Sequence, residues 1–122
     1  MSRLIDPGLG DYLDRLTILH LKIRYGGLSG KPTAHFSKEA DVIETKISLR
    51  TSVKPGEVAE LAAVNAALWE AEDTLRRLRT SADIGLIAAV AIRIQTLNDA
   101  RGAVVEAINR GAGDFTGAEK HG

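Results

Sequence analysis

Three polar side chains interrupt the apolar face of a long helical pattern, and their types and spacing make them the first candidates for chemistry. Asn65, Glu72 and Arg76 occur in "AAVNAALWEAEDTLRRLR", residues 62–79. Offsets of seven and eleven residues return to within about 20° on an α-helix, so the three side chains lie on one line. Burying such groups unpaired costs about 1–3 kcal/mol each. We therefore expect them to have protein partners or a ligand.

Two interpretations of this polar line follow from its position beside apolar residues. In the structural one, Glu72 and Arg76 form an i,i+4 ion pair at the edge of the core and Asn65 bonds a neighbouring helix. In the functional one, the line and Trp69, four residues from Asn65, face a partly hydrated pocket between helices. Asp73 is adjacent in the sequence and belongs to the same candidate set.

Polar residues on two other helical patterns could face the same pocket. They are Asp11, Asp14, Arg15 and Lys22 near the start of the chain, and Asn98, Asp99 and Arg101 in "LNDAR". A ligand site predicts that five charged residues converge in one concave pocket, namely Arg15, Lys22, Glu72, Arg76 and Arg101. The alternatives are a solvated charged face on the first helix, and a helix–helix hydrogen bond with a surface cation on the last.

Four helices are predicted to position these residues. Apolar residues at helical spacing indicate helices over 10–25, 34–50, 57–79 and from a Ser81 or Asp83 cap to about Arg110. The first pattern is apolar on nearly every side and is expected at the centre, whereas the second has one apolar face and is expected outside. The fold class is therefore all-α, a four-helix-bundle-like domain over 1–112 with a glycine-rich, flexible tail over 113–122.

Composition excludes several classes of protein. Sixteen basic and sixteen acidic residues cancel, which disfavours nucleic acid as a partner. The absence of cysteine excludes disulfides and cysteine-ligated zinc. No apolar run approaches the ~20 residues that cross a bilayer, and the first residues lack a secretory pattern. We expect a cytoplasmic protein that contacts no membrane.

Metal and enzyme signals are weak. The pairs Glu57 with Glu60 and Glu70 with Asp73 resemble the carboxylate motifs of helical nucleotide pyrophosphohydrolases, but all four residues fall on one predicted helix. The histidines lack a third ligand at a suitable spacing, so no metal and no cofactor are predicted. A chorismate-mutase-like bundle, in which Arg and Lys side chains grip a dicarboxylate, is an enzyme alternative that rests on residue types.

Three segments, "GDYLDRLTILHLKI", "VNAALWEAEDTLR" and "LNDARGAVVEAIN", resemble successive signatures of an uncharacterised bacterial family, a domain of unknown function sometimes found near or fused to glycan-related enzymes. The matching positions are Gly10, Asp14, Arg15, Thr17, Lys22, Asn65, Trp69, Glu72, Asp73, Arg76, Asn98, Asp99, Arg101 and Asn109. Members of the family usually end in a segment with acidic residues and lysine, and in this sequence only "GAEKHG" resembles that segment. The resemblance implies a shared set of polar positions and no activity.

The function predicted from the sequence is binding of a small polar or anionic ligand at an inter-helix polar cluster. The second prediction is a protein-interaction module, with a homodimer or a larger enzyme as the partner, because the first helix is apolar almost all round and the last is long. A partner-binding role predicts a large exposed apolar patch, whereas a ligand site predicts a polar concavity.

Overall fold

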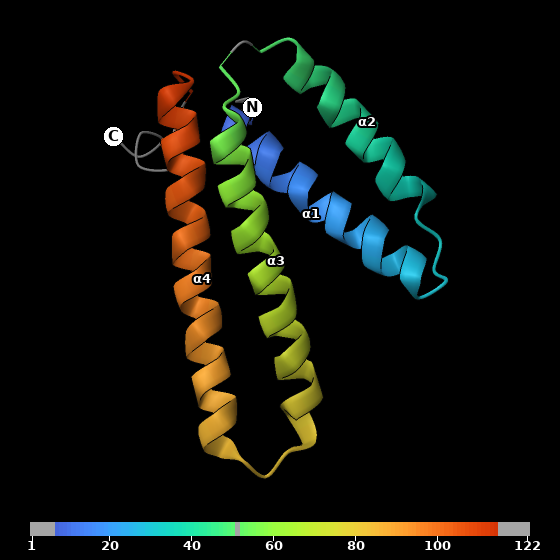
Figure 1. The fold of residues 1–122 in the computed structure, drawn as a ribbon, viewed down its shortest axis with the longest axis vertical. Helices are drawn as coiled ribbons and strands as arrows, with labels where there is room; N and C mark the ends of the chain where they lie inside the picture. Colours follow the sequence, from blue (N-terminus) through green and yellow to red (C-terminus); the bar gives the residue numbers. More distant parts are fainter. Residues whose placement is uncertain (1–6, 51, 115–122) are drawn as a thin grey trace, which may run out of the picture.

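A computed structural model describes residues 7–50 and 52–114. Within these ranges the chain forms four α-helices and one short 3₁₀ helix and no strand, so the predicted all-α class is confirmed (Figure 1). The helices are α1 (Leu9–Leu28), α2 (Ala34–Ser48), α3 (Pro55–Arg77) and α4 (Ile84–Gly111), and η1 (Leu78–Thr80) extends the end of α3.

Local chemistry explains where the helices begin and end. Pro55 occupies the first turn of α3, where a missing N–H costs no hydrogen bond. Asp83, one of the two predicted caps, accepts a hydrogen bond from the Leu86 N–H at 3.0 Å at the start of α4. After α1, Gly30 takes a φ of +73°, a left-handed conformation that favours glycine. α1 extends about one turn beyond its predicted end at residue 25.

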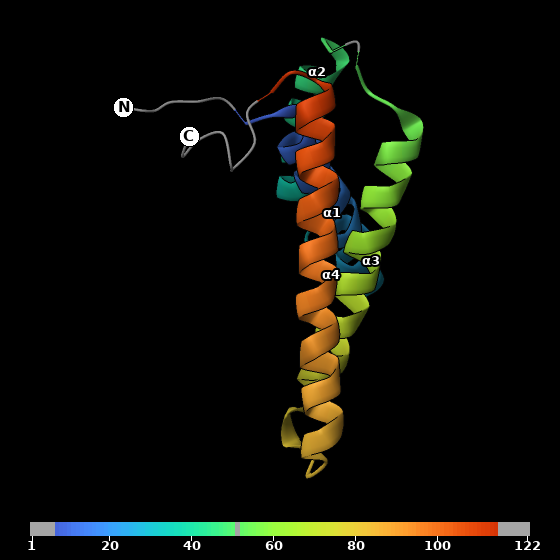
Figure 2. The same cartoon turned by 90° about the vertical axis from the view of Figure 1, so that its left-hand side faces the viewer.

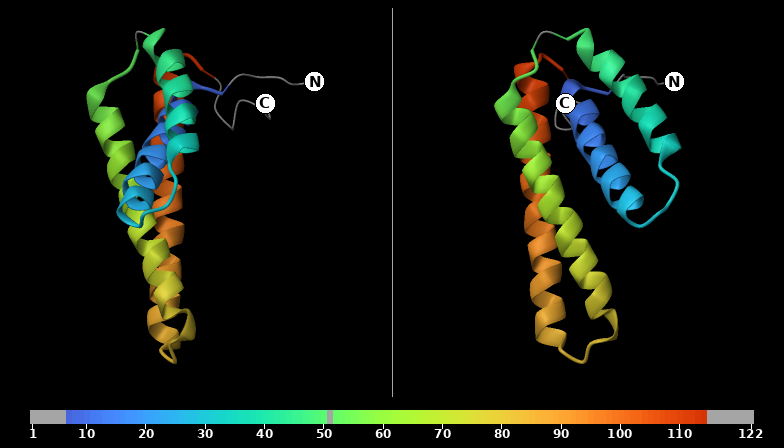
Figure 3. Two further views of the ribbon diagram at one scale, coloured as in Figure 1. Left: turned by 90° about the vertical axis from the view of Figure 1, so that its right-hand side faces the viewer. Right: turned by 45° about the vertical axis from the view of Figure 1, so that its right-hand side comes forward.

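The predicted places of the first two helices are also confirmed. α1 packs against α2, α3 and α4, and α2 lies on the outer side of α1 (Figures 1 and 3). One buried cluster joins α1, α3 and α4 and consists of Leu9, Leu13, Leu61 and Ile108. The other joins α1 and α2 and consists of Leu19, Ala40 and Ile43.

α1 crosses the other helices obliquely, and this decides which residues are covered. Its first half lies against α3 and α4, and its second half diverges from them (Figure 1). The lower parts of α3 and α4 consequently continue as a two-helix hairpin beyond α1 (Figure 2). No helix of the described chain is long and apolar enough to span a membrane.

The end of α4 is tied to the start of α1. Asp114 accepts a hydrogen bond from the Leu9 N–H at 2.7 Å and pairs with Arg50 at 2.8 Å. Burial by itself raises the pKa of the Asp114 carboxyl, but these two hydrogen bonds outweigh it, so the pKa lies below its ordinary value. The predicted tail begins at Gly113, and its residues 115–122 lie outside the described residues.

Candidate functional site

A buried polar network joins three helices beneath the crossing of α1. Asn65 of α3 donates one amide hydrogen bond to Asp14 Oδ1 at 2.9 Å and another to Thr17 Oγ1 at 2.7 Å, both on α1. Arg101 of α4 forms a fork on the Asp14 carboxylate, with Nε 3.0 Å from Oδ1 and a terminal nitrogen 2.9 Å from Oδ2. The predicted bond of Asn65 to a neighbouring helix therefore forms.

The arrangement of this network follows from helix geometry. Asp14 and Thr17 are three residues apart and so share the α1 face that meets α3. The Thr17 hydroxyl donates to the Asp14 backbone carbonyl at 2.8 Å, which leaves its oxygen lone pairs free to accept from Asn65. Because Asn65 is only 3% exposed and Asp14 9%, these mutual bonds offset the cost of desolvation.

A second polar contact fixes the closest approach of α1 to α4. The Gly10 N–H donates to Asn109 Oδ1 at 2.6 Å, and the Asn109 amide donates to Asp11 at 3.2 Å. A Cβ at Gly10 would collide with the Val105 carbonyl oxygen, so only glycine allows this spacing. Gly10 and Asn109, two positions of the family resemblance, thus have a structural role here.

Arg15 does not join the other cations, contrary to the convergence that a ligand site predicted. It forms a two-pronged ion pair with Glu39 of α2, at 2.7 and 2.9 Å. The hydrogen bond to Arg15 is the main cause that holds the pKa of Glu39 below its ordinary value, and the same bond raises the pKa of Arg15. Arg15 lies on the α2 side of α1, where its role is to pair these two helices.

The other four charged residues that a ligand site was predicted to bring together do converge. Lys22 of α1, Glu72 and Arg76 of α3 and Arg101 of α4 line one pocket of about 250 Å³. Its remaining walls are Asn65, Trp69 and apolar side chains of α1 and α3. α1 and α3 diverge along their length (Figure 3), and side chains of both helices line the pocket. Three cations and one carboxylate line it, and two of the cations, Arg101 and Arg76, are already paired with the carboxylates of Asp14 and Asp73.

The predicted Glu72–Arg76 ion pair is wrong. Arg76 instead reaches back one turn to Asp73 at 3.5 Å, and Arg77 approaches the same carboxylate at 3.4 Å. Both arginines are more than half exposed, so these contacts contribute little to stability. Among the described residues, Glu72 and Lys22 form no ion pair, and Asn65 Oδ1 accepts no hydrogen bond. The pocket wall therefore holds groups that a bound molecule could pair with.

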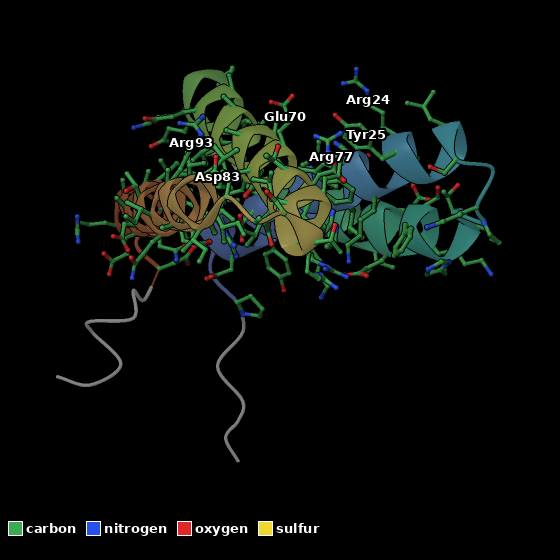
Figure 4. All side chains as sticks on the ribbon, turned by 90° about the horizontal axis from the view of Figure 1, so that it is seen from below. Arg24, Tyr25, Glu70, Arg77, Asp83 and Arg93 are labelled. Atoms are coloured by element: carbon green, nitrogen blue, oxygen red, sulfur yellow. The ribbon has the colours of Figure 1, made fainter. Side chains whose placement is uncertain are left out.

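A larger cleft of about 1060 Å³ adjoins this pocket and shares Lys22, Trp69 and Arg76 with it. Tyr25 stacks on Trp69 with ring centroids 5.2 Å apart, and this pair forms part of the cleft wall. Tyr25, Glu70 and Arg77 are labelled in Figure 4, on the side where the end of α1 meets lower α3. Asp73 also lines this cleft rather than the smaller pocket.

Several residues of this cleft were not predicted as site residues. They are Tyr25, Lys31, His35, Phe36 and Arg77. Tyr25 and Phe36 flank the "GGLSGKP" turn, and the grouping of aromatic and basic residues around that turn is a signal in the sequence that could have found them. The sequence pattern does not specify the angle at which α1 diverges from α3, so the cleft itself could not be predicted.

Asn98 and Asp99 are not brought to the pocket. They are exposed on α4 and line a separate shallow hollow with Asp11 and Asp14, on another side of Arg101. Within residues 7–50 and 52–114, no three His, Asp or Glu side chains are grouped closely enough to hold a metal ion. His20 lies 3.6 Å from Glu44 on the exposed side of the α1–α2 pair.

Comparison with known proteins gives no relative for this chain. No family model, no curated protein and no solved structure matches it. The functional interpretation therefore depends on the geometry of the polar network and the pocket.

Proposed function

We propose that the protein binds a small anionic ligand in the pocket between α1 and α3. The observation that carries this proposal is that Lys22, Arg76 and Arg101, from three different helices, line the same 250 Å³ pocket with Glu72 as the single carboxylate. Cations held on rigid helices at one concavity are the arrangement that recognises carboxylate or phosphate groups.

The three cations would contribute differently. Arg101 is fixed by its fork on Asp14, so it presents its remaining N–H donors in a set direction. Arg76 is held by one exposed contact to Asp73, and Lys22 by a contact with the Phe36 ring at 5.3 Å. Arg76 can turn toward an anion at little cost because its exposed ion pair is weak, and Lys22 has only the contact with the Phe36 ring to exchange.

The rest of the wall restricts the ligand further. Asn65 Oδ1 offers an acceptor for a hydroxyl or N–H group, and the Trp69 ring offers an apolar face. A molecule that combines one or two carboxylate or phosphate groups with a donor and a small apolar body suits these features. The adjoining cleft beside Tyr25 gives room for a larger body.

Trp69 provides a direct test, because it is the only tryptophan and lies in the pocket. Its fluorescence should change when inorganic phosphate, a hydroxylated dicarboxylate or an aromatic carboxylate is titrated into the protein. At 100 times its dissociation constant, a ligand should also stabilise the native state by about 2.7 kcal/mol, measured by thermal unfolding.

Matched variants separate this site from general charge attraction. Arg76→Ala should abolish the fluorescence change and the stabilisation while the variant remains folded. Arg79→Ala removes an exposed cation just past the same helix, outside both cavities, and should leave both signals intact. No response to any probe class, or an equal loss in the two variants, would refute binding at this pocket.

A further inference from the structure

Aromatic side chains from three helices line the larger cleft. They are Tyr25 of α1, Phe36 of α2 and Trp69 of α3, and the Tyr25 and Trp69 rings stack with an angle of 11° between their planes. The chain has one Trp, two Tyr and two Phe, so most of its aromatic residues lie at this one cleft. All three are half-buried, which leaves part of each ring available for contact. Aromatic walls of this kind bind planar rings by stacking.

Cations extend along both cavities instead of meeting at one point. Lys22 and Arg76 line the pocket and the cleft, Arg101 lines the pocket alone, and Lys31 and Arg77 line the cleft alone. Within residues 7–50 and 52–114, Lys22 and Lys31 form no ion pair. A single carboxylate would pair with one or two of these groups. The spread therefore favours an anion that carries more than one charged group.

The cleft wall also holds a carboxylate that has no cation partner among the described residues. This is Glu70, which is exposed, whereas Asp73 is paired with Arg76 and Arg77. Tyr25, Glu70 and Arg77 are labelled in Figure 4. A carboxylate accepts hydrogen bonds from hydroxyl groups and repels phosphate. The surroundings of Glu70 therefore suit a neutral, hydroxylated part of a ligand.

On the basis of the anion site proposed above, we infer that the ligand is a nucleoside diphosphate. Its phosphates lie at Lys22, Arg76 and Arg101, its base lies among the aromatic rings of the cleft, and its sugar hydroxyls face Glu70. One molecule can occupy both cavities because they adjoin and share Lys22, Trp69 and Arg76. The cleft of about 1060 Å³ is at the upper end of the range of about 300–1,000 Å³ for ligand sites, so a single-ring acid would leave most of it empty.

A free nucleotide suits this site better than a strand of nucleic acid. A strand carries a negative charge at every nucleotide and is bound by a basic surface along its length. In this chain sixteen acidic residues offset sixteen basic ones, and two carboxylates, Glu70 and Asp73, lie on the cleft wall itself. A ligand whose charge is concentrated at one end avoids these carboxylates.

Isothermal titration calorimetry of the full chain with ADP, AMP and pyrophosphate tests the inference. ADP should bind at least about fivefold more tightly than pyrophosphate, because it adds a base that stacks on the cleft wall. It should also bind more tightly than AMP, because the cations are spread over more than one phosphate group. If pyrophosphate or AMP bound as tightly as ADP, the nucleoside diphosphate would be refuted while the anion site remained. Binding of a dicarboxylate alone would have the same meaning, and binding of no anion would refute both proposals.

Variants at the two tyrosines place the base. Tyr25→Leu should remove the advantage of ADP over pyrophosphate and leave the affinity for pyrophosphate unchanged, whereas Tyr25→Phe should keep both. Tyr12→Leu is the matched control, because Tyr12 packs against the α1–α2 cluster and lines neither cavity. It should bind both ligands as the wild type does. An advantage of ADP that survives Tyr25→Leu, or that Tyr12→Leu removes equally, would overturn the placement of a base in this cleft.

Discussion

The two ends of one polar line on α3 have opposite surroundings. Asn65 is 3% exposed and bonded to Asp14 and Thr17, whereas Arg76, eleven residues later, is mostly exposed and lies at a pocket. Both side chains leave the same face of the same helix. What differs is the cover that α1 provides: Asp14 and Thr17 of α1 contact Asn65 directly, whereas Arg76 lies at the pocket between α1 and α3.

This difference shows that covering by a neighbouring helix separates structural polar groups from available ones. At the closed end, each amide hydrogen of Asn65 has a partner, and removing it leaves buried acceptors unpaired. At the open end, water solvates Glu72 and Arg76, and their contacts can be exchanged for those of a ligand at little cost. The same residue types thus serve stability at one end and, in the function proposed here, ligand binding at the other.

Substitution at the two ends should separate these roles most strongly. Asn65→Ala should lower the free energy of unfolding by about 2–3 kcal/mol, because Asp14 and Thr17 lose a buried donor. Glu72→Ala, seven residues later on the same face, should change it by no more than about 0.5 kcal/mol. Urea unfolding of both variants measures the contrast, and equal losses would show that the pocket end is structural as well.

Much of this fold was predictable from the helical spacing of the apolar residues. The four helices, the central place of α1 and the outer place of α2 follow from where the apolar residues of each helix lie. The bond of Asn65 to a neighbouring helix was predictable from the cost of burying an amide. These predictions depend on local sequence and on the requirement that buried polar groups be paired.

The composition of the pocket was only partly predictable. Lys22, Glu72, Arg76 and Arg101 converge, but Arg15 turns to Glu39 on α2, a partner on a different helix. Arg76 selects Asp73 rather than Glu72, although both are within one turn. The crossing angle of α1 determines which faces meet, and sequence spacing on single helices does not specify that angle.

The closed end also depends on how closely α1 approaches α4. Gly10→Ala should destabilise the fold by about 2 kcal/mol, because the added methyl group would meet the backbone of α4 at Val105. Gly102→Ala has no atom within 4 Å of its added Cβ and should stabilise the fold by about 0.5–1 kcal/mol through helix propensity. Thermal unfolding of the two variants should show opposite signs. The same sign would contradict a tight contact at Gly10.

The smallest expected effect concerns Asp114, which follows α4 and contacts Leu9 at the start of α1 and Arg50 after α2. Its folded pKa lies below the unfolded value of about 3.9, so its contribution to stability is present above that pH and is lost as the pH falls through the folded pKa.

Asp114→Asn should therefore be less stable than the wild type by about 1 kcal/mol at neutral pH, because the Arg50 pair loses its charge while Leu9 keeps an acceptor. The gap should narrow when urea unfolding is repeated near pH 3, where the wild-type carboxylate is protonated in the unfolded chain and increasingly in the folded one. Other titrating groups are common to both proteins, so the difference between their unfolding curves isolates Asp114. If the difference in free energy of unfolding between the two proteins stayed constant from neutral pH to pH 3, the charge of the Asp114 carboxylate would not contribute to the contacts with Leu9 and Arg50.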